Sequence, residues 1–149
     1  MLYKEKMDIT IPINGIRLNI RTAVIIETEN GYIFEKDSLD RFYWVTGGRI
    51  HINETSEEAA KREIKEELGI NVDNIKLKAI VESFFELDNE NFHEICFYYE
   101  YKINGNINLP ENYYCFSKME MEKLNILPKI LIDIINSKNK EIMHIIIKE

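Results

Sequence analysis

The chain has 149 residues, of which 45% are hydrophobic and 11% aromatic. This length and composition suffice for one well-filled core, but the chain is too short for two ordinary domains. Its 19 basic and 26 acidic side chains give a formal net charge of -7, which argues against a nucleic-acid partner, because non-specific binding to phosphates needs a basic surface. A nucleotide site remains compatible with this charge, since a bound divalent cation supplies local positive charge. We therefore expect one compact domain over residues 1–149.

The amino terminus and the cysteines indicate the compartment. The first ten residues mix charges into their apolar positions, and no stretch approaches the roughly 20 apolar residues of a membrane span. The two cysteines, Cys96 and Cys115, make neither a disulfide framework nor a four-ligand zinc site. We expect a cytoplasmic protein without membrane contact.

The first part of the chain predicts short strands. Residues 16–26 are rich in β-branched and aliphatic side chains, and turn residues at 29–31 separate them from the apolar run 32–34, as in a hairpin. A further strand-like run, 42–45, precedes the glycine pair Gly47-Gly48.

A helix is expected over residues 55–68. Thr55 with Glu58 three residues later has the form of a capping box, and Gly69 stands where a helix would stop. Apolar residues recur between these ends at helical spacing, which predicts one buried face.

The rest of the chain predicts two long strands, 76–87 and 92–103, then a helix at 128–136 and a last strand at 142–147. Helices alternate with strand pairs that hairpin-like turns connect. We therefore expect the α/β class in its mixed α+β form, with a mixed sheet and helices packed against it.

Charges on the first helix are arranged in a way that stability does not require. Glu63, Glu66 and Glu67 lie at i, i+3 and i+4, so they share one helix face, and two of them stand in the last turn, where the helix dipole disfavours anions. We expect these carboxylates to form a cluster. All-oxygen ligands favour a hard cation, and the usual one in phosphate chemistry is Mg²⁺, with Mn²⁺ as a substitute.

Residues 48–70, GRIHINETSEEAAKREIKEELGI, resemble a complete Nudix box. That pattern is a glycine, then Glu after five residues, then Arg-Glu-aliphatic-any-Glu-Glu-any-Gly-aliphatic after seven more. The matching positions are Gly48, Glu54, Arg62, Glu63, Ile64, Glu66, Glu67, Gly69 and Ile70. The chain thus resembles the Nudix (MutT-like) hydrolase family. Thr46 and Asn53 flank the fixed positions where proline and glycine are commoner, and Asn53 can keep the turn because Asn tolerates left-handed backbone.

The resemblance implies an α/β/α sandwich with the box helix packed on its mixed sheet. It also implies that Glu63, Glu66 and Glu67 bind the metal, joined by the Gly48 carbonyl. Arg62 would pair with Glu54 and fix the loop against the helix. Glu63 is the best candidate for a catalytic base, with service as a ligand alone as the alternative. The implied reaction is attack of water on a phosphorus of a diphosphate bridge.

Candidates outside the box are individually weaker. A further acidic residue near the metal is expected from Glu82, Glu94 or Glu111, each of which is also explained as a solvated carboxylate. Substrate contacts are expected from four residues, each of which core packing or surface charge also explains. These are Arg41, Trp44, Arg49 and Phe84.

The sequence therefore predicts a metal-dependent pyrophosphohydrolase that cleaves a diphosphate linkage in a nucleoside diphosphate derivative or a nucleoside triphosphate. The alternatives are a non-catalytic nucleotide-binding regulator with the same fold, and an isomerase acting on isoprenoid diphosphates. The substrate stays open, although the absence of proline between Ile70 and Pro110 disfavours ADP-ribose. Edge strands or the apolar carboxyl-terminal run would allow a homodimer.

Overall fold

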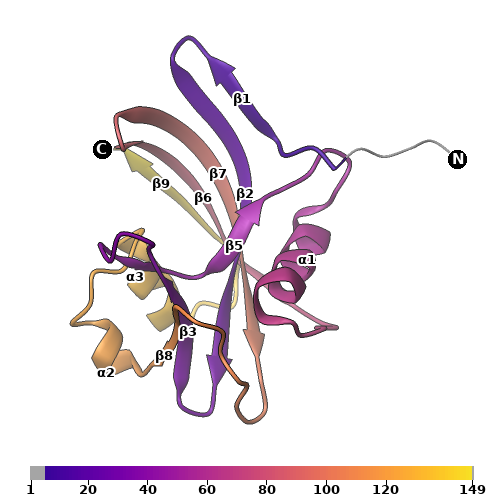
Figure 1. Cartoon of the computed structure of the whole chain (residues 1–149), viewed down its shortest axis with the longest axis vertical. Coiled ribbons are helices and arrows are strands. Elements are labelled where there is room, and N and C mark those ends of the chain that lie inside the picture. Colours follow the sequence, from indigo (N-terminus) through magenta and orange to yellow (C-terminus); the bar gives the residue numbers. More distant parts are fainter. Residues whose placement is uncertain (1–5, 149) are drawn as a thin grey trace, which may run out of the picture.

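A computed structural model describes residues 6–148 and contains one mixed sheet with helices on both of its faces (Figure 1). The elements in chain order are β1 (Thr10–Ile13), β2 (Ile16–Thr28), β3 (Gly31–Lys36), β4 (Tyr43–Trp44), β5 (Thr46–Arg49), α1 (Ser56–Leu68), β6 (Lys76–Leu87), β7 (Glu90–Lys102), β8 (Tyr113–Phe116), α2 (Lys118–Met121), α3 (Ile130–Asn136) and β9 (Met143–Lys148).

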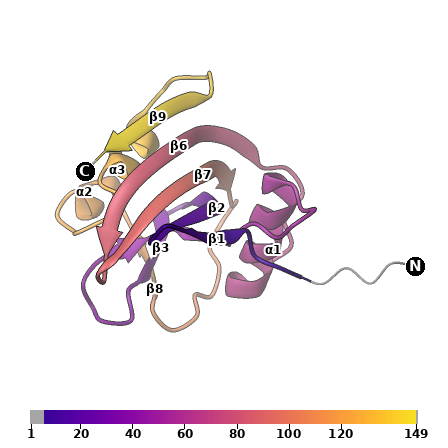
Figure 2. The same ribbon diagram turned by 90° about the horizontal axis from the view of Figure 1, so that it is seen from above.

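The long strands set the architecture of the sheet. The main order is β4-β3-β2-β7-β6-β9, and β1 and β5 pair with β2 while β8 pairs with β3. The pairs β2–β7 and β6–β9 are parallel and the other pairs are antiparallel. Figure 2 shows β9, β6, β7 and β2 side by side in one curved layer.

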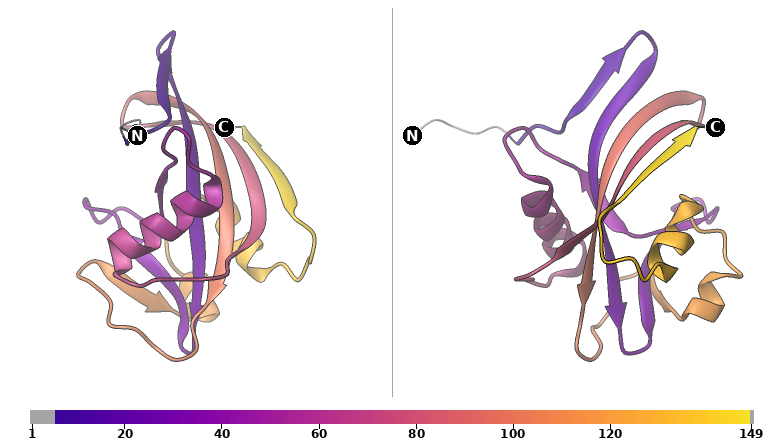
Figure 3. Two further views of the ribbon diagram at one scale, coloured as in Figure 1. Left: turned by 90° about the vertical axis from the view of Figure 1, so that its right-hand side faces the viewer. Right: turned by 180° about the vertical axis from the view of Figure 1, so that it is seen from behind.

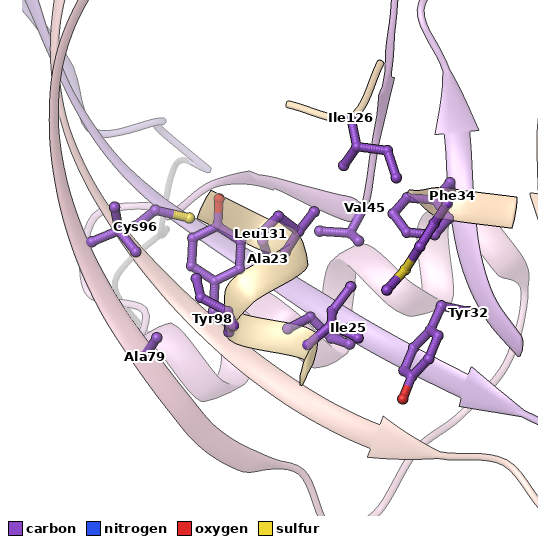
Figure 4. Close-up of a cluster of buried hydrophobic side chains, with 14 residues drawn as sticks. Ala23, Ile25, Tyr32, Phe34, Val45, Ala79, Cys96, Tyr98, Ile126 and Leu131 are labelled. Carbon is purple, nitrogen blue, oxygen red and sulfur yellow. The ribbon is translucent and has the colours of Figure 1, made fainter. Parts of the chain in front are cut away.

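Strand β2 contributes side chains to two separate hydrophobic cores, because successive side chains of a strand point to opposite faces. Ala23 and Ile25 pack in the cluster that contains residues of α2 and α3, part of which Figure 4 shows. Val24 and Ile26 pack with Ile64 in the cluster under α1. Figure 3 shows α1 across one face of the sheet and α3 on the other.

The predicted fold class and most predicted elements are confirmed. The helix expected at 55–68 is α1, with Thr55 as its N-cap and Gly69 as a left-handed C-cap. Asn53 has a φ of 65°, so it keeps the left-handed turn before the helix. Four short elements were not predicted, namely β1, β5, β8 and α2. Within residues 6–148, no helix is long and apolar enough to cross a membrane.

Candidate active site

Helix α1 places its charged residues against strand β5. The capping box forms in full, and Ala59, Ala60, Ile64 and Leu68 are buried, which fixes the rotation of the helix about its axis. Glu63 and Glu67 flank that buried stripe, so they turn toward Gly47 and Gly48 of β5.

Arg62 anchors the loop that connects β5 with α1. Its guanidinium donates to both carboxylate oxygens of Glu54, at 2.7 and 2.9 Å, and to the Arg49 carbonyl at 3.1 Å. Burial acts to raise the pKa of Glu54, but hydrogen bonds from Arg62 and from the His51 backbone outweigh it and lower that pKa. A bidentate Arg–carboxylate pair is rigid, so it holds the loop in register with the helix.

Glu63 lies against the backbone of Gly48. A Cβ at Gly48 would overlap the Glu63 carboxylate, so only glycine permits this approach. Arg62 Nη1 donates to Glu63 Oε1 at 2.9 Å. Burial nevertheless raises the pKa of Glu63, with Arg62 opposing the shift.

Glu67 is more buried than Glu63. Tyr113 Oη, from β8, donates to its Oε1 at 2.8 Å, and the Gly47 amide donates to its Oε2 at 3.2 Å. Burial, together with the nearby Glu35 and Glu63 charges, raises the pKa of Glu67 to about 8 against these two hydrogen bonds. A carboxyl in this state lacks a compensating positive charge.

The three box glutamates do not converge, contrary to the predicted cluster. Arg62 Nη1 also donates to Glu66 at 3.2 Å, and the Glu66 side chain is 53% exposed. Within residues 6–148, no three His, Cys, Asp or Glu side chains gather closely enough to hold one metal ion. Shared helical spacing put the carboxylates on one face, but their end positions depend on Arg62, Tyr113 and Gly47.

A cavity of about 490 Å³ opens on the opposite face of β5 and β2. Aromatic side chains contribute to its wall, with Phe42 and Trp44 in edge-to-face contact at 4.9 Å and Phe85 stacked on Phe92 at 5.1 Å. Its polar lining comes from both strands and their neighbours and consists of Asn19, Arg21, Glu35, Gly47, Arg49, Ser83, Glu86 and Glu94. Gly47 therefore lines the cavity while its amide binds Glu67 of the box helix.

Residues 19–134 match the NUDIX domain family. The chain belongs to the Nudix family. It is accordingly a Nudix hydrolase, an enzyme of the pyrophosphatase type that acts on phosphoric anhydride bonds, and members of this family generally use divalent metal ions. The predicted family membership is thereby confirmed.

Solved structures of Nudix proteins share the fold at low sequence identity. The MutT protein of Bacillus halodurans has a TM-score of 0.69 at 20% identity, over 85% of this chain and 89% of that chain. The Ap4A hydrolase of C. elegans has a TM-score of 0.60 at 13% identity, over 79% and 93% of the two chains. An ADP-ribose pyrophosphatase of Streptococcus suis has a TM-score of 0.56 at 13% identity, over 85% of this chain and 98% of that chain. No curated protein matches the chain.

Two of the four predicted substrate contacts line the cavity of this Nudix domain, namely Trp44 and Arg49. Arg41 does not, because its guanidinium is bonded to Asp37 at 2.7 Å and to Asp88 at 2.8 Å. Phe84 does not either. It lies on the other face of β6 against His93, and its neighbour Phe85 lines the cavity instead.

The three candidate acids separate in the same way. Glu94 lines the cavity and accepts a hydrogen bond from Asn19 Nδ2 at 2.8 Å. Glu82 is bonded to His144 at 2.6 Å and is absent from the cavity wall, and Glu111 is an exposed loop residue. The cavity lies on the face of β5 opposite the box glutamates, so the expectation of a further acid near the metal stays a prediction.

Three residues near the site were missed or given another role. Glu35 and Arg21 line the cavity, and no local motif marks them, because strand pairing alone brings them there. Tyr113 was missed as a partner of the box helix, although its hydroxyl binds Glu67. The alternation of β2 would have placed Arg21 on one face with Ala23 and Ile25, but not next to β5.

Proposed function

We propose that the protein hydrolyses a diphosphate linkage in a nucleoside diphosphate derivative or a nucleoside triphosphate, with Mg²⁺ as its cofactor and Mn²⁺ as a substitute. The observation that carries the proposal is the position of Gly47. Its amide binds Glu67 of the box helix, and the same residue lines an aromatic-walled cavity. Carboxylates and cavity are thus separated by one strand.

The residues present fit a hard divalent cation. Glu63 and Glu67 are carboxyls whose pKa values burial raises, and the all-oxygen donor set of the box suits Mg²⁺. The absence of a Cβ at Gly48 lets the chain approach the Glu63 carboxylate. In our proposal Glu63, Glu66 and Glu67 hold the ion together with the Gly48 carbonyl, and binding draws the exposed Glu66 carboxylate away from Arg62 to join the other two.

A bound divalent cation would lower the pKa of an attacking water and neutralise charge on the leaving phosphate. We assign Glu63 as the base that accepts the proton of this water at a carboxylate oxygen. The water oxygen then forms a bond to phosphorus, and the bridging P–O bond breaks with its electron pair on the leaving phosphate. Tyr113 and the Gly47 amide orient Glu67, and Arg62 with Glu54 keeps the loop fixed.

The cavity supports a substrate with a flat apolar portion. Phe42 and Trp44 on one side and Phe85 and Phe92 on the other offer faces and edges for a nucleobase. Diadenosine polyphosphates, oxidised nucleotides and sugar nucleotides are candidates within this class. The alternative function, a non-catalytic nucleotide-binding regulator, is disfavoured by the complete set of box residues.

The test is release of phosphate or nucleotide from a panel of nucleoside diphosphate derivatives and triphosphates. Each reaction is run with Mg²⁺, with Mn²⁺ and with a chelator. We expect cleavage of at least one substrate with metal and none with chelator. Tight nucleotide binding without cleavage of any panel member would contradict the proposal and favour the regulator.

A further inference from the structure

Two arginines with the same charge stand directly opposite each other on the cavity face of the sheet. Arg21 of β2 and Arg49 of β5 are partners in the antiparallel ladder, and both line the cavity. Like charges at directly opposite positions destabilise a sheet. A chain with a net charge of -7 has many acidic residues with which to avoid this arrangement, so the pair calls for a functional reason.

Neither guanidinium is satisfied by the surrounding protein. Arg21 approaches Glu94 only to 3.9 Å, and Arg49 approaches Asp8 only to 3.8 Å. Within residues 6–148, neither side chain donates a hydrogen bond, whereas Arg62 binds Glu54 at 2.7 Å. Each guanidinium carries five N–H donors, so the pair presents many donors toward the cavity.

The neighbouring groups leave the guanidinium groups of Arg21 and Arg49 available to a ligand. Asn19 donates to Glu94 at 2.8 Å and so holds that carboxylate to itself, beyond hydrogen-bonding distance of Arg21. Arg62 donates to the Arg49 carbonyl at 3.1 Å, which fixes the backbone at the end of β5. Gly47, two residues before Arg49, binds Glu67. The two arginines therefore lie roughly 7 Å along β5 from the backbone that holds a box carboxylate.

We propose that Arg21 and Arg49 form a clamp that binds a phosphate group of the substrate inside the cavity, across β5 from the box glutamates. Planar guanidinium groups bind phosphate oxygens in a bidentate manner, and a phosphate dianion between them removes the repulsion of the like-charged pair. The clamp rests on the proposed function for the identity of its anion, a phosphate of a nucleoside diphosphate or longer. It selects ligands with at least two linked phosphates over nucleosides.

The experiment measures binding rather than turnover. Methylene-bridged analogues of ADP and GDP, which cannot be cleaved at that bridge, are titrated calorimetrically into the protein with Mg²⁺, and adenosine and guanosine serve as uncharged probes. The variants are Arg21→Gln and Arg49→Gln. The matched control is Arg17→Gln, because Arg17 is on β2 and is paired with Glu90 at 2.6 Å outside the cavity wall.

We expect Arg21→Gln and Arg49→Gln each to weaken binding of the better analogue by about tenfold or more, as loss of a charge-assisted hydrogen bond does. Arg17→Gln should bind the analogue as the wild type does, and the nucleosides should not distinguish the proteins. Thermal unfolding checks the fold, and Arg21→Lys and Arg49→Lys provide variants that keep the charge and lose the bidentate geometry.

The clamp is wrong if the two cavity variants bind the analogue like Arg17→Gln, or if the wild type binds the analogues no more tightly than the nucleosides. Failure of the hydrolase proposal looks different. Clamp-dependent binding of the analogues, together with no cleavage of any substrate in the panel, would refute hydrolysis and leave the clamp in place.

Discussion

The two faces of strands β2 and β5 differ in how their functional groups are encoded. On the α1 face, the carboxylates come from one 13-residue helix, and their spacing is visible in the sequence. On the cavity face, the lining comes from β2, β3, β4, β5, β6, β7, β9 and residues before α3. In our proposal the groups for chemistry are thus locally encoded, whereas those for recognition depend on long-range strand pairing. The predictions below separate these two roles.

The largest expected effect is on the α1 face. Glu67→Gln should lower kcat by about two orders of magnitude or more, because it removes a proposed ligand of the metal whose charge activates water. Steady-state rates with saturating substrate measure this effect. Glu57→Gln is the matched control, since Glu57 is on the same helix and its side chain is 51% exposed. Its ion pair with Lys61 is long, at 3.8 Å. Equal rates for the two variants would contradict the assignment of Glu67.

Arg62→Gln should destabilise the fold by about 3 kcal/mol, because it leaves the half-buried Glu54 carboxylate without its bidentate partner. Urea unfolding with Mg²⁺ absent measures the free energy. Arg17→Gln removes a pair that is more exposed than Arg62–Glu54 and should cost about 1 kcal/mol or less. Similar losses for both variants would mean that Arg62 does not anchor the loop.

Glu67 should also make stability depend on pH in the absence of metal. Its folded pKa of about 8 lies above the ordinary 4.5, so its contribution is fully present below pH 4.5 and is lost as the pH rises toward 8. Relative to Glu67→Gln, the wild type should lose on the order of 1 to 3 kcal/mol over that range. Urea unfolding of both proteins in chelator at pH 5 and pH 8 measures the difference. A pH-independent difference would contradict the buried, uncompensated carboxyl.

The smallest expected effect distinguishes neighbours on opposite faces of β6. Phe85→Ala should raise KM by about three- to tenfold, because Phe85 lines the cavity and its ring offers about 1 kcal/mol of aromatic contact. Phe84→Ala should leave KM within about twofold, since Phe84 packs on His93 outside the cavity wall. A larger KM change for Phe84→Ala than for Phe85→Ala would contradict the placement of the substrate in the cavity.

The sequence predicted the helix and its partners because their interactions are separated by few residues. The pair of Arg62 with Glu54, the N-cap at Thr55 and the left-handed Asn53 all follow from spacing and backbone preference. The same reasoning failed for Phe84 and Arg41. Adjacent residues of a strand point to opposite faces, so an error of one residue assigned Phe84 to the cavity in place of Phe85. Arg41 is paired with Asp88, which lies 47 residues away in the sequence.

The separation of Glu66 from Glu63 and Glu67 could not be predicted either, for a different reason. Helical spacing determines the face on which a side chain stands but not its rotamer or partner. Tyr113 lies 46 residues from Glu67, in a four-residue strand without a periodic signal. Its hydrogen bond is a consequence of the β3–β8 pairing.

The division of roles between the two faces is tested most directly by one kinetic cycle on the substrate that the panel identifies. kcat and KM are measured with Mg²⁺ for the wild type, Glu67→Gln, Phe85→Ala and the double variant. We expect Glu67→Gln to lower kcat with KM nearly constant, Phe85→Ala to raise KM with kcat nearly constant, and the double variant to show both changes. A rise in KM with unchanged kcat for Glu67→Gln would contradict the assignment of chemistry to helix α1.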